Sequence, residues 1–200
     1  MSQRPDDATV TAWALAAGRG DTEALAAFVR ATQTDVHRFL VHLSGPADAE
    51  DLAQETYLRA LRTLPSFAAR ASARTWLLSI ARRVSVDAVR TAVRRPRTQG
   101  ADDWEGLLDR AGAARPGAGR SGAHEAVLLR ALVADLGPER REAFVLTQML
   151  DLSYAEAAQV CDCPVGTIRS RVARAREDLV DALDADRGSG ASPGRCRDGA

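Results

Sequence analysis

The stretch from residue 152 to residue 176 constrains the fold of this chain most strongly, because it predicts two short helices joined by a tight turn. Ser153 is placed to cap the first helix, and Glu156 stands where it would complete a capping box. Pro164 and Gly166 mark the turn between the helices. The pattern indicates a helix-turn-helix.

The second helix of this motif begins at Thr167 or Val165 and is strongly basic. Apolar side chains on both helices are spaced to form a small core between them: Ala157, Val160, Ile168 and Val172. The exposed side chains of the second helix are then mostly guanidinium groups. Arginine-rich helices are often only solvated surfaces, but here the basic helix follows a turn and small residues that permit close helix crossing. The combination predicts a recognition helix that enters a DNA major groove.

The charge of the chain is balanced overall but unevenly distributed. Lys plus Arg number 27 and Asp plus Glu number 27, and every basic residue is an arginine. Residues 61–97 are rich in arginine and contain a single acid, Asp87, whereas residues 1–60 and 125–162 are acidic on balance. Basic patches beside acidic surfaces indicate two kinds of partner.

Membrane and secreted proteins are disfavoured by what the sequence lacks. No apolar run is long enough to span a membrane, and no secretory signal begins the chain, so we expect a cytoplasmic protein without a membrane partner. Cys161, Cys163 and Cys196 are too few for a disulfide framework. The Cys161–Cys163 spacing is shorter than that of zinc sites, so we expect a structural role for Cys163, in the turn.

An enzyme is also disfavoured. His37, His42 and His124 do not cluster with a nucleophile or a carboxylate pair, and no glycine-rich phosphate loop follows a strand. For His37 and His42 a surface or interface position is the simpler interpretation. We therefore expect no catalytic residue, no metal and no cofactor.

Helical periodicity dominates the chain and strand signals are almost absent, so the predicted fold class is all-α. The first domain is expected over residues 8–96, with helices over 9–17, 21–43, 48–64 and 72–89. A flexible, Gly- and Pro-rich linker over 97–123 separates it from a second helical domain over 124–185, and a disordered tail over 186–200 follows. Two small helical domains joined by a linker are the expected architecture.

Apolar spacing predicts which side of each helix is buried. Asp21 is expected to cap the second helix. The third helix is expected to carry Leu52, Leu58 and Leu61 on its apolar side, and the fourth an apolar side that includes Trp76 and Val89. A base-stacking platform is an alternative interpretation of Trp76, but its spacing favours the core.

A mixed polar stripe lies along the third helix. Asp51, Gln54, Glu55 and Leu58 fall at i, i+3, i+4 and i+7, so they share one face. For acids alone an ordinary solvated face is the simpler interpretation. A stripe that combines acids, an amide and a leucine is better suited to docking on a basic partner helix.

Three blocks, residues 48–60, residues 67–82 and residues 163–171, occur in an order that resembles the extracytoplasmic-function class of bacterial RNA polymerase sigma factors. The resemblance covers residues 8–184. It implies a sigma region 2 domain that binds core polymerase and melts the −10 element, and a sigma region 4 domain that reads the −35 element. The implied partners are core RNA polymerase, through its β′ clamp helices and β flap, and promoter DNA. Many members are also held by an anti-sigma protein, although nothing in this sequence identifies one.

The resemblance implies roles for three groups of residues. Those that bind the clamp helices are Asp51, Gln54 and Glu55. Those at the −10 element are Arg82, Arg83, Asp87, Arg90, Arg94 and Arg95. Those at the −35 element are Arg169, Ser170, Arg171, Ala173, Arg174 and Arg176. Arg83 departs from the family, since many relatives carry Asn there, so the base preference at that point stays open.

Two further function classes compete with a sigma factor. A stand-alone helix-turn-helix regulator is the nearest alternative, but such proteins usually carry an α/β receiver or a ligand-binding domain upstream, and this N-terminal half is helical. A structural helical adaptor is disfavoured by the asymmetric distribution of arginine.

Overall fold

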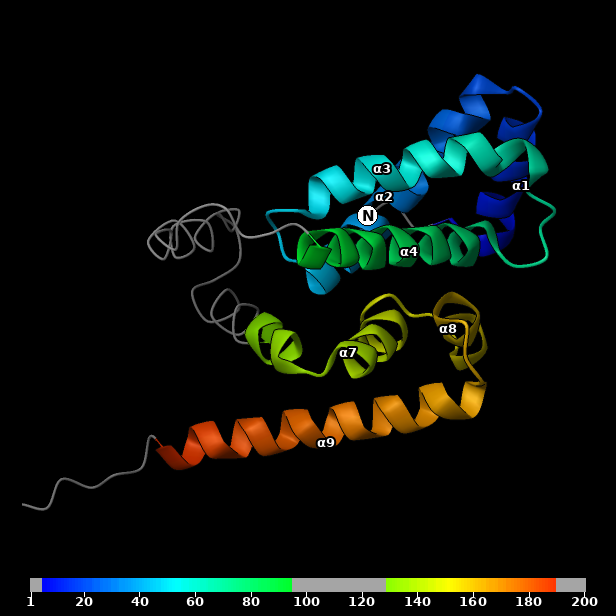
Figure 1. Ribbon diagram of the computed structural model, residues 1–200. Coiled ribbons are helices and arrows are strands. Elements are labelled where there is room, and N and C mark those ends of the chain that lie inside the picture. Colours follow the sequence, from blue (N-terminus) through cyan, green and yellow to red (C-terminus); the bar gives the residue numbers. More distant parts are fainter. Residues whose placement is uncertain (1–4, 95–128, 190–200) are drawn as a thin grey trace, which may run out of the picture.

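The computed structural model describes residues 5–94 and 129–189. Within these ranges the regular structure is helical, as predicted, and contains no strand (Figure 1). The linker predicted over 97–123 lies outside the described residues, as do most of the residues of the predicted tail.

The first domain consists of four α-helices and a short 3₁₀ turn. In chain order these are α1 (Asp7–Gly18), α2 (Thr22–Ser44), α3 (Ala49–Thr63), η1 (Leu64–Ser66) and α4 (Ala73–Arg94). The predicted cap at Asp21 is confirmed, because its Oδ1 atom accepts hydrogen bonds from the backbone N–H groups of Glu23 and Ala24, at 3.0 and 2.9 Å.

The second domain carries the helix-turn-helix. Its elements are α7 (Pro138–Phe144), η2 (Val145–Met149), which is a π-helical turn, α8 (Tyr154–Cys161) and α9 (Val165–Ser189). Helix α9 continues beyond residue 185, the predicted end of this domain, so the first residues of the predicted tail are helical.

The helix-turn-helix forms as predicted, with one difference in its turn. Ser153 and Glu156 make the capping box, with the Ser153 N–H 2.9 Å from the Glu156 carboxylate. The turn is made by Asp162, in the left-handed conformation with φ of 52°, and by Pro164, whereas Gly166 lies inside α9. The predicted core residues of the motif are all buried: Ala157, Val160, Ile168 and Val172.

Three apolar residues of the first domain are more exposed than their spacing predicted, although the rest of the predicted apolar side of α4 is buried or half-buried. On α3 the fully buried side chains are small or short, so this helix packs closely against α2 and α4: Ala49, Thr56 and Ala60. Leu58 and Leu61 are instead 51% and 42% exposed, and Val89 on α4 is 54% exposed. These three predictions were wrong because helical spacing alone does not say which of two adjacent apolar stripes meets a neighbour.

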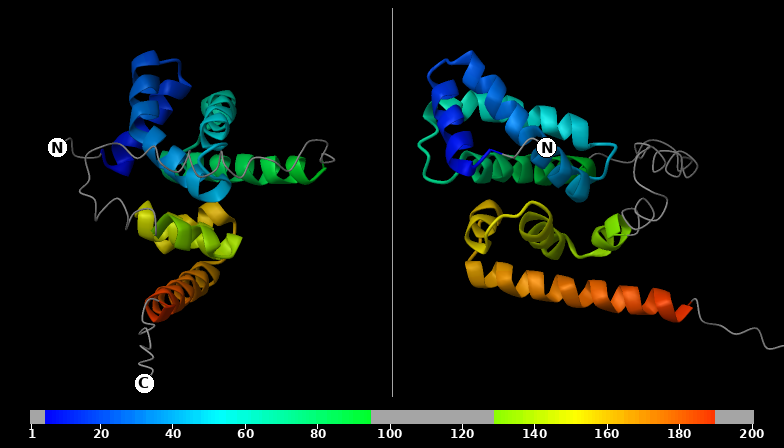
Figure 2. Two further views of the ribbon diagram at one scale, coloured as in Figure 1. Left: turned by 90° about the vertical axis from the view of Figure 1, so that its left-hand side faces the viewer. Right: turned by 180° about the vertical axis from the view of Figure 1, so that it is seen from behind.

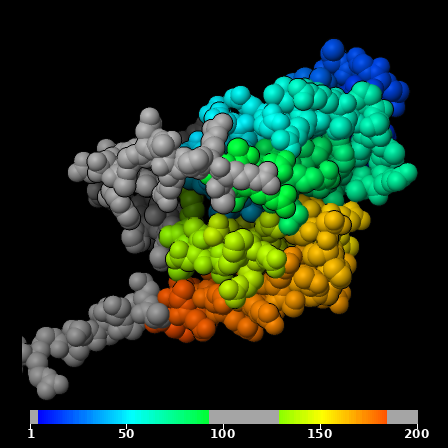
Figure 3. Space-filling model, in the orientation of Figure 1, coloured from blue at the N-terminus to red at the C-terminus, as the bar shows by residue number. Residues whose placement is uncertain are grey.

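The two domains pack against each other. Helix α4 lies between α3 on one side and α7 and α8 on the other, and α9 runs along the far side of the second domain (Figures 1 and 2). In the space-filling view the two domains are in contact along α4 (Figure 3). Their buried side chains belong to one continuous hydrophobic cluster.

A buried arginine joins the domains at the start of α4. The Nε atom of Arg74 lies 2.7 Å from Oδ2 of Asp35 on α2, and its Nη2 atom donates to the carbonyl oxygen of Leu150 in the second domain. Arg74 and Asp35 are both almost fully buried. Charges withdrawn from water in this way must stay paired, so the contact fixes the two domains relative to each other.

Candidate nucleic-acid interface

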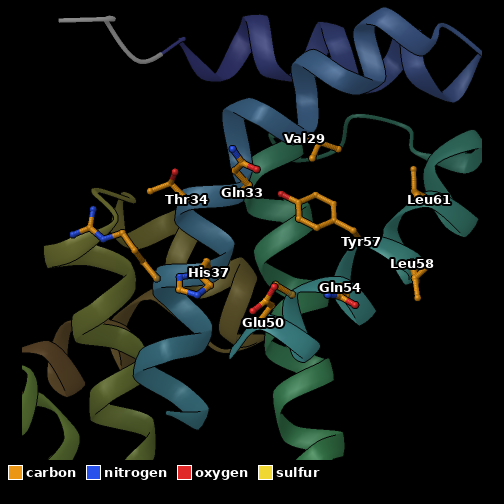
Figure 4. A pocket seen from close by; sticks show the side chains of 11 residues that line it. Val29, Gln33, Thr34, His37, Glu50, Gln54, Tyr57, Leu58 and Leu61 are labelled. Carbon is orange, nitrogen blue, oxygen red and sulfur yellow. The ribbon is translucent and has the colours of Figure 1, made fainter. Parts of the chain in front are cut away.

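A groove of about 730 Å³ lies between α2 and α3 (Figure 4). Its apolar wall includes Val29, Tyr57 and the two exposed leucines, Leu58 and Leu61. The rim is polar and carries charge of both signs, from Gln33, His37, Arg38, Glu50 and Gln54. Exposed leucines gathered in one groove mark a surface that a partner covers.

Tyr57 is held at the floor of this groove. Its hydroxyl group lies 2.8 Å from the Oγ1 atom of Thr32 on α2, and burial raises the pKa of Tyr57 to about 12. The ring therefore presents its apolar face to the groove in the neutral state.

The three residues predicted to bind polymerase differ in their exposure and in their contacts. Gln54 lines the groove and Asp51 is exposed. Glu55 is half-buried, and its Oε1 atom accepts a hydrogen bond from Arg59 at 2.7 Å. Arg59 also donates to Asp87 of α4 at 2.7 Å, so Glu55 and Asp87 belong to one ion-pair chain that joins α3 to α4. Both carboxylates raise the pKa of Arg59.

The arginines of α4 divide into exposed and paired groups. Arg83 and Arg90 are exposed, as DNA contacts require. Arg82 is half-buried, and its Nε atom lies 2.9 Å from the Oε2 atom of Glu142 in the second domain. Arg94 is the last residue of α4, but its side chain lies outside the described part of the chain, as does the whole of Arg95.

A second hollow, of about 440 Å³, lies at the start of α4. Its aromatic wall is formed by Phe67 and Trp76, whose ring centroids are 4.8 Å apart with an interplanar angle of 37°. Arg70 and Ser79 line the same hollow, and Gln159 of α8 reaches it from the second domain. Trp76 is half-buried, so it packs against the core and also lines this hollow.

On α9, most of the residues predicted to read DNA are exposed: Arg169, Ser170, Ala173, Arg174 and Arg176. Arg171 differs from them. Its side chain is 18% exposed, its Nη2 atom lies 2.5 Å from Oε2 of Glu139, and its Nη1 atom lies 3.8 Å from Sγ of Cys163. Arg171 therefore holds α9 against α7 and the turn.

The interface between the domains is centred on Glu142. Its Oε2 atom accepts from Arg82 and lies 3.9 Å from the Sγ atom of Cys161. Burial, with a smaller contribution from the Glu142 charge, raises the pKa of the Cys161 thiol to about 12. The thiol is therefore protonated at neutral pH, and it is placed to donate to the carboxylate. Cys163 is half-buried in the turn, where a structural role was predicted.

Sequence reasoning missed three features of these surfaces. Glu142 gave no signal, because its importance depends on a contact between residues 60 positions apart. Leu58 and Leu61 were placed on the apolar side of the third helix, but both are exposed, as the docking stripe predicted for Leu58 alone requires.

The described residues show neither a metal site nor a membrane span. Within residues 5–94 and 129–189, no three His, Cys, Asp or Glu side chains are grouped so as to hold a metal ion. No helix in the same ranges is long and apolar enough to cross a membrane.

Comparison with known proteins identifies two family regions in this chain. Residues 28–95 match the family described as Sigma-70 region 2, and residues 126–179 match Sigma-70, region 4. The ECF RNA polymerase sigma factor SigC of Mycobacterium tuberculosis is 51% identical over 181 residues, which is 90% of this chain and 95% of that protein. The ECF RNA polymerase sigma factor EcfG of Rhodopseudomonas palustris is 36% identical, over 82% of this chain and 88% of its own.

Two solved structures are also similar to this chain. The sigma factor RpoE in complex with the anti-sigma factor NepR from Bartonella quintana superimposes with a TM-score of 0.66 at 26% identity, covering 82% of this chain and 99% of that one. CnrH in complex with the cytosolic domain of CnrY has a TM-score of 0.67 at 23% identity, covering 89% and 99%, and shows a shared fold.

Proposed function

Because the chain belongs to the sigma-70 family of RNA polymerase sigma factors, in its extracytoplasmic-function class, we propose that separate surfaces of it bind core polymerase, the −10 element and the −35 element. A sigma factor directs core polymerase to promoters, and membership of this family supports a protein that is not itself an enzyme. The stand-alone regulator is not favoured, because the matched regions are those of sigma factors along both domains.

The groove between α2 and α3 is the docking surface for core polymerase. An amphipathic partner helix would cover Leu58 and Leu61 with its apolar face, while Asp51 and Gln54 meet basic or polar side chains on its flanks. Glu55 acts there mainly by orienting Arg59, to which it is bonded. Burying two half-exposed leucines supplies affinity, and the polar rim fixes the register.

The hollow at the start of α4 receives an unstacked base of the −10 element. A flipped base needs an aromatic or apolar wall and nearby hydrogen-bonding groups, which Phe67, Trp76 and Ser79 provide. The exposed arginines Arg83 and Arg90 supply positive charge along the single strand. We assign Arg82, Arg94 and Arg95 to the same strand.

The exposed face of α9 reads the −35 element as duplex. Arg169 and Arg174 project to solvent and are suited to bidentate contacts with guanine. Arg176 is exposed and donates to Gln148 at 2.7 Å, and we assign it to a phosphate contact, which adds affinity without reading sequence. Arg171 has a positioning role, because it is bonded to Glu139 and not free for the major groove.

One arrangement carries the proposal: the leucine-lined groove and the arginine face of α9 belong to separate parts of the molecule, with α4 and α8 between them (Figure 1). Polymerase and duplex DNA can therefore be held at different surfaces. We assign residues 8–96 to the polymerase and −10 functions and residues 124–185 to the −35 function, with residues 97–123 as the connection. Two DNA-binding domains on one chain bind more tightly than either does alone, because binding of the first raises the effective concentration of the second.

Anti-sigma proteins form a second class of partner. RpoE of Bartonella quintana is solved in complex with such a protein, and we extend that class of partner to this chain. The exposed leucine groove is the surface that an inhibitor of polymerase binding has to cover.

Run-off transcription tests the proposal, with the purified full-length protein and core polymerase on a genomic promoter library. We expect discrete transcripts that disappear with the Arg169→Ala, Arg174→Ala double variant, which should still bind core polymerase. The Leu58→Ser, Leu61→Ser double variant should lose core binding, whereas Val89→Ser, an exposed apolar residue outside the groove, should retain it. A protein that shifts DNA alone but neither binds core polymerase nor yields a transcript would instead be a stand-alone regulator.

A further inference from the structure

A cavity of about 350 Å³ lies between the two domains, on the side of α2. Helix α2 contributes His37, Arg38 and His42, and the second domain contributes Leu129, Arg130 and Met149. Cationic or protonatable side chains thus face the cavity from both domains, and no acid lines it among the residues that the structure describes. We propose that this cavity binds a small organic anion, and that the bound anion holds the two domains together.

The positive charge around the cavity has no acidic partner among the described residues that line it. In the part of the chain that the structure describes, the guanidinium groups of Arg38 and Arg130 have neither a hydrogen bond nor an ion pair. Other arginines of the interface, Arg74 and Arg82, are each paired with a carboxylate. Arg38 and Arg130 are exposed arginines from different domains, and at one cavity they can both reach the same anionic group.

A third arginine adds to this field at the end of α2. The Nη1 atom of Arg141 lies 3.5 Å from the carbonyl oxygen of His42, and its Nε atom is buried without a partner among the described residues. Burial lowers the pKa of His42, and the charges of Arg130, Arg38 and Arg141 lower it further. A bound anion would offset this repulsion and favour the protonated imidazole.

The size and the remaining walls of the cavity define the class of ligand. Its volume is at the lower end of the range of about 300–1,000 Å³ that is usual for small-molecule sites. Val41, Leu129 and Met149 provide an apolar surface beside the cations, and methionine packs well against a ring. The site therefore suits a compact molecule with two or more negative charges, carried by phosphate or carboxylate groups.

Binding at this cavity has a consequence for the domain arrangement. The complete site exists only while both domains are packed, so the ligand stabilises the closed arrangement and disfavours any state in which they separate. A ligand at one hundred times its Kd would shift that equilibrium about 100-fold. His37 and Arg38 also line the groove between α2 and α3, so the ligand would also affect that surface.

Calorimetric titration of the full-length protein at fixed ionic strength tests the site, with ADP, citrate and uncharged adenosine as probes. We expect saturable 1:1 binding of an anionic probe and none of adenosine. The Arg38→Gln, Arg130→Gln variant should weaken binding about ten-fold or more. The Arg30→Gln, Arg62→Gln variant removes the same charge from exposed positions outside the cavity and should bind as the unmodified protein does. ADP without citrate would identify a nucleotide site, and equal binding of both a general polyanion site.

Hydrogen exchange provides a second readout that does not depend on transcription. A bound probe should slow hydrogen exchange in α4 and α8, which lie at the domain interface. This protection should appear in the unmodified protein and in the Arg30→Gln, Arg62→Gln variant, but not in the Arg38→Gln, Arg130→Gln variant. The proposal is overturned if neither anion binds at millimolar concentration, if adenosine binds equally well, or if both double variants lose the same affinity. Each of these results would leave the proposed function in transcription unaffected, because that is tested by transcription and by variants of Leu58, Leu61, Arg169 and Arg174, none of which lines this cavity.

Discussion

The Nε atom of Arg82 lies 2.9 Å from the Oε2 atom of Glu142, so a side chain assigned to promoter DNA is paired with a carboxylate of the other domain. Glu142 is buried, and Cys161 lies beside the same carboxylate oxygen. In the packed arrangement Arg82 is therefore engaged, and Gln159 stands at the hollow assigned to the flipped base. We therefore expect single-stranded DNA and the second domain to compete for α4.

Glu142→Gln is expected to raise affinity for single-stranded −10 DNA. The substitution removes the counter-charge of Arg82 and weakens the contact between the domains, by an amount on the order of 1 kcal/mol because Arg82 is partly exposed. Fluorescence anisotropy with a labelled non-template oligonucleotide measures the gain, which should be several-fold. Glu139→Gln is the matched control, because Glu139 lies on the same helix and pairs within its own domain. Equal affinities for the two variants would contradict the competition.

Asp35→Asn is expected to destabilise the protein strongly. It leaves the Arg74 guanidinium buried without its carboxylate partner, which typically costs about 3–5 kcal/mol. Urea unfolding, followed by circular dichroism, measures the decrease in the free energy of unfolding. Asp178→Asn serves as the control, because Asp178 pairs with Arg140 at 2.9 Å on the surface, where a pair contributes about 0–1 kcal/mol. Losses of similar size in the two variants would show that the Arg74 pair has no special structural role.

Arg174→Ala is expected to weaken DNA binding, whereas Arg171→Ala is expected to lower the stability of the second domain. Arg174 is exposed, so its loss should weaken binding to a −35 duplex by about 1–3 kcal/mol without affecting stability. Arg171 is bonded to Glu139, so its loss should lower the thermal midpoint of the second domain and affect DNA only indirectly. Duplex titrations on cognate and scrambled DNA, paired with thermal unfolding, separate the effects. If Arg171→Ala loses sequence discrimination at unchanged stability, the positioning role is wrong.

Local patterns allowed much of this fold to be predicted from the sequence. Caps act over three residues, so Asp21 and the Ser153–Glu156 capping box were predictable from the residues alone. The buried positions of the helix-turn-helix were predictable too, because both helices of the motif are adjacent in the chain and fix each other's inner face.

Features that depend on distant contacts were not predictable in this way. Leu58 and Leu61 were placed on an apolar side because spacing gives an apolar stripe but not the neighbour that covers it. Ala49, Thr56 and Ala60 face the neighbouring helices instead. The Arg82–Glu142 pair depends on two domains meeting, and the chain between them gives no local signal for that contact. The sequence therefore suggested Arg82 as a site residue on α4, which stays a prediction, but gave no sign of the carboxylate that pairs with it.

Stability should fall at alkaline pH because of Cys161. Burial raises the pKa of its thiol from 9.0 to about 12, so the folded state holds a proton that the unfolded chain releases above pH 9. The stabilisation is complete below pH 9 and is lost as the pH rises towards 12, at up to about 1.4 kcal/mol per pH unit. Tyr57, whose pKa is raised from 10.0 to about 12, adds to the loss only above pH 10.

The window between pH 9 and pH 10 therefore isolates Cys161 from Tyr57. Urea unfolding at several pH values across it should give a falling free energy of unfolding for the unmodified protein and a flatter profile for Cys161→Ala. Cys163→Ala, the same substitution at the half-buried cysteine of the turn, should keep the slope. If Cys161→Ala keeps the pH slope of the unmodified protein, the thiol is not buried as its contact with Glu142 requires.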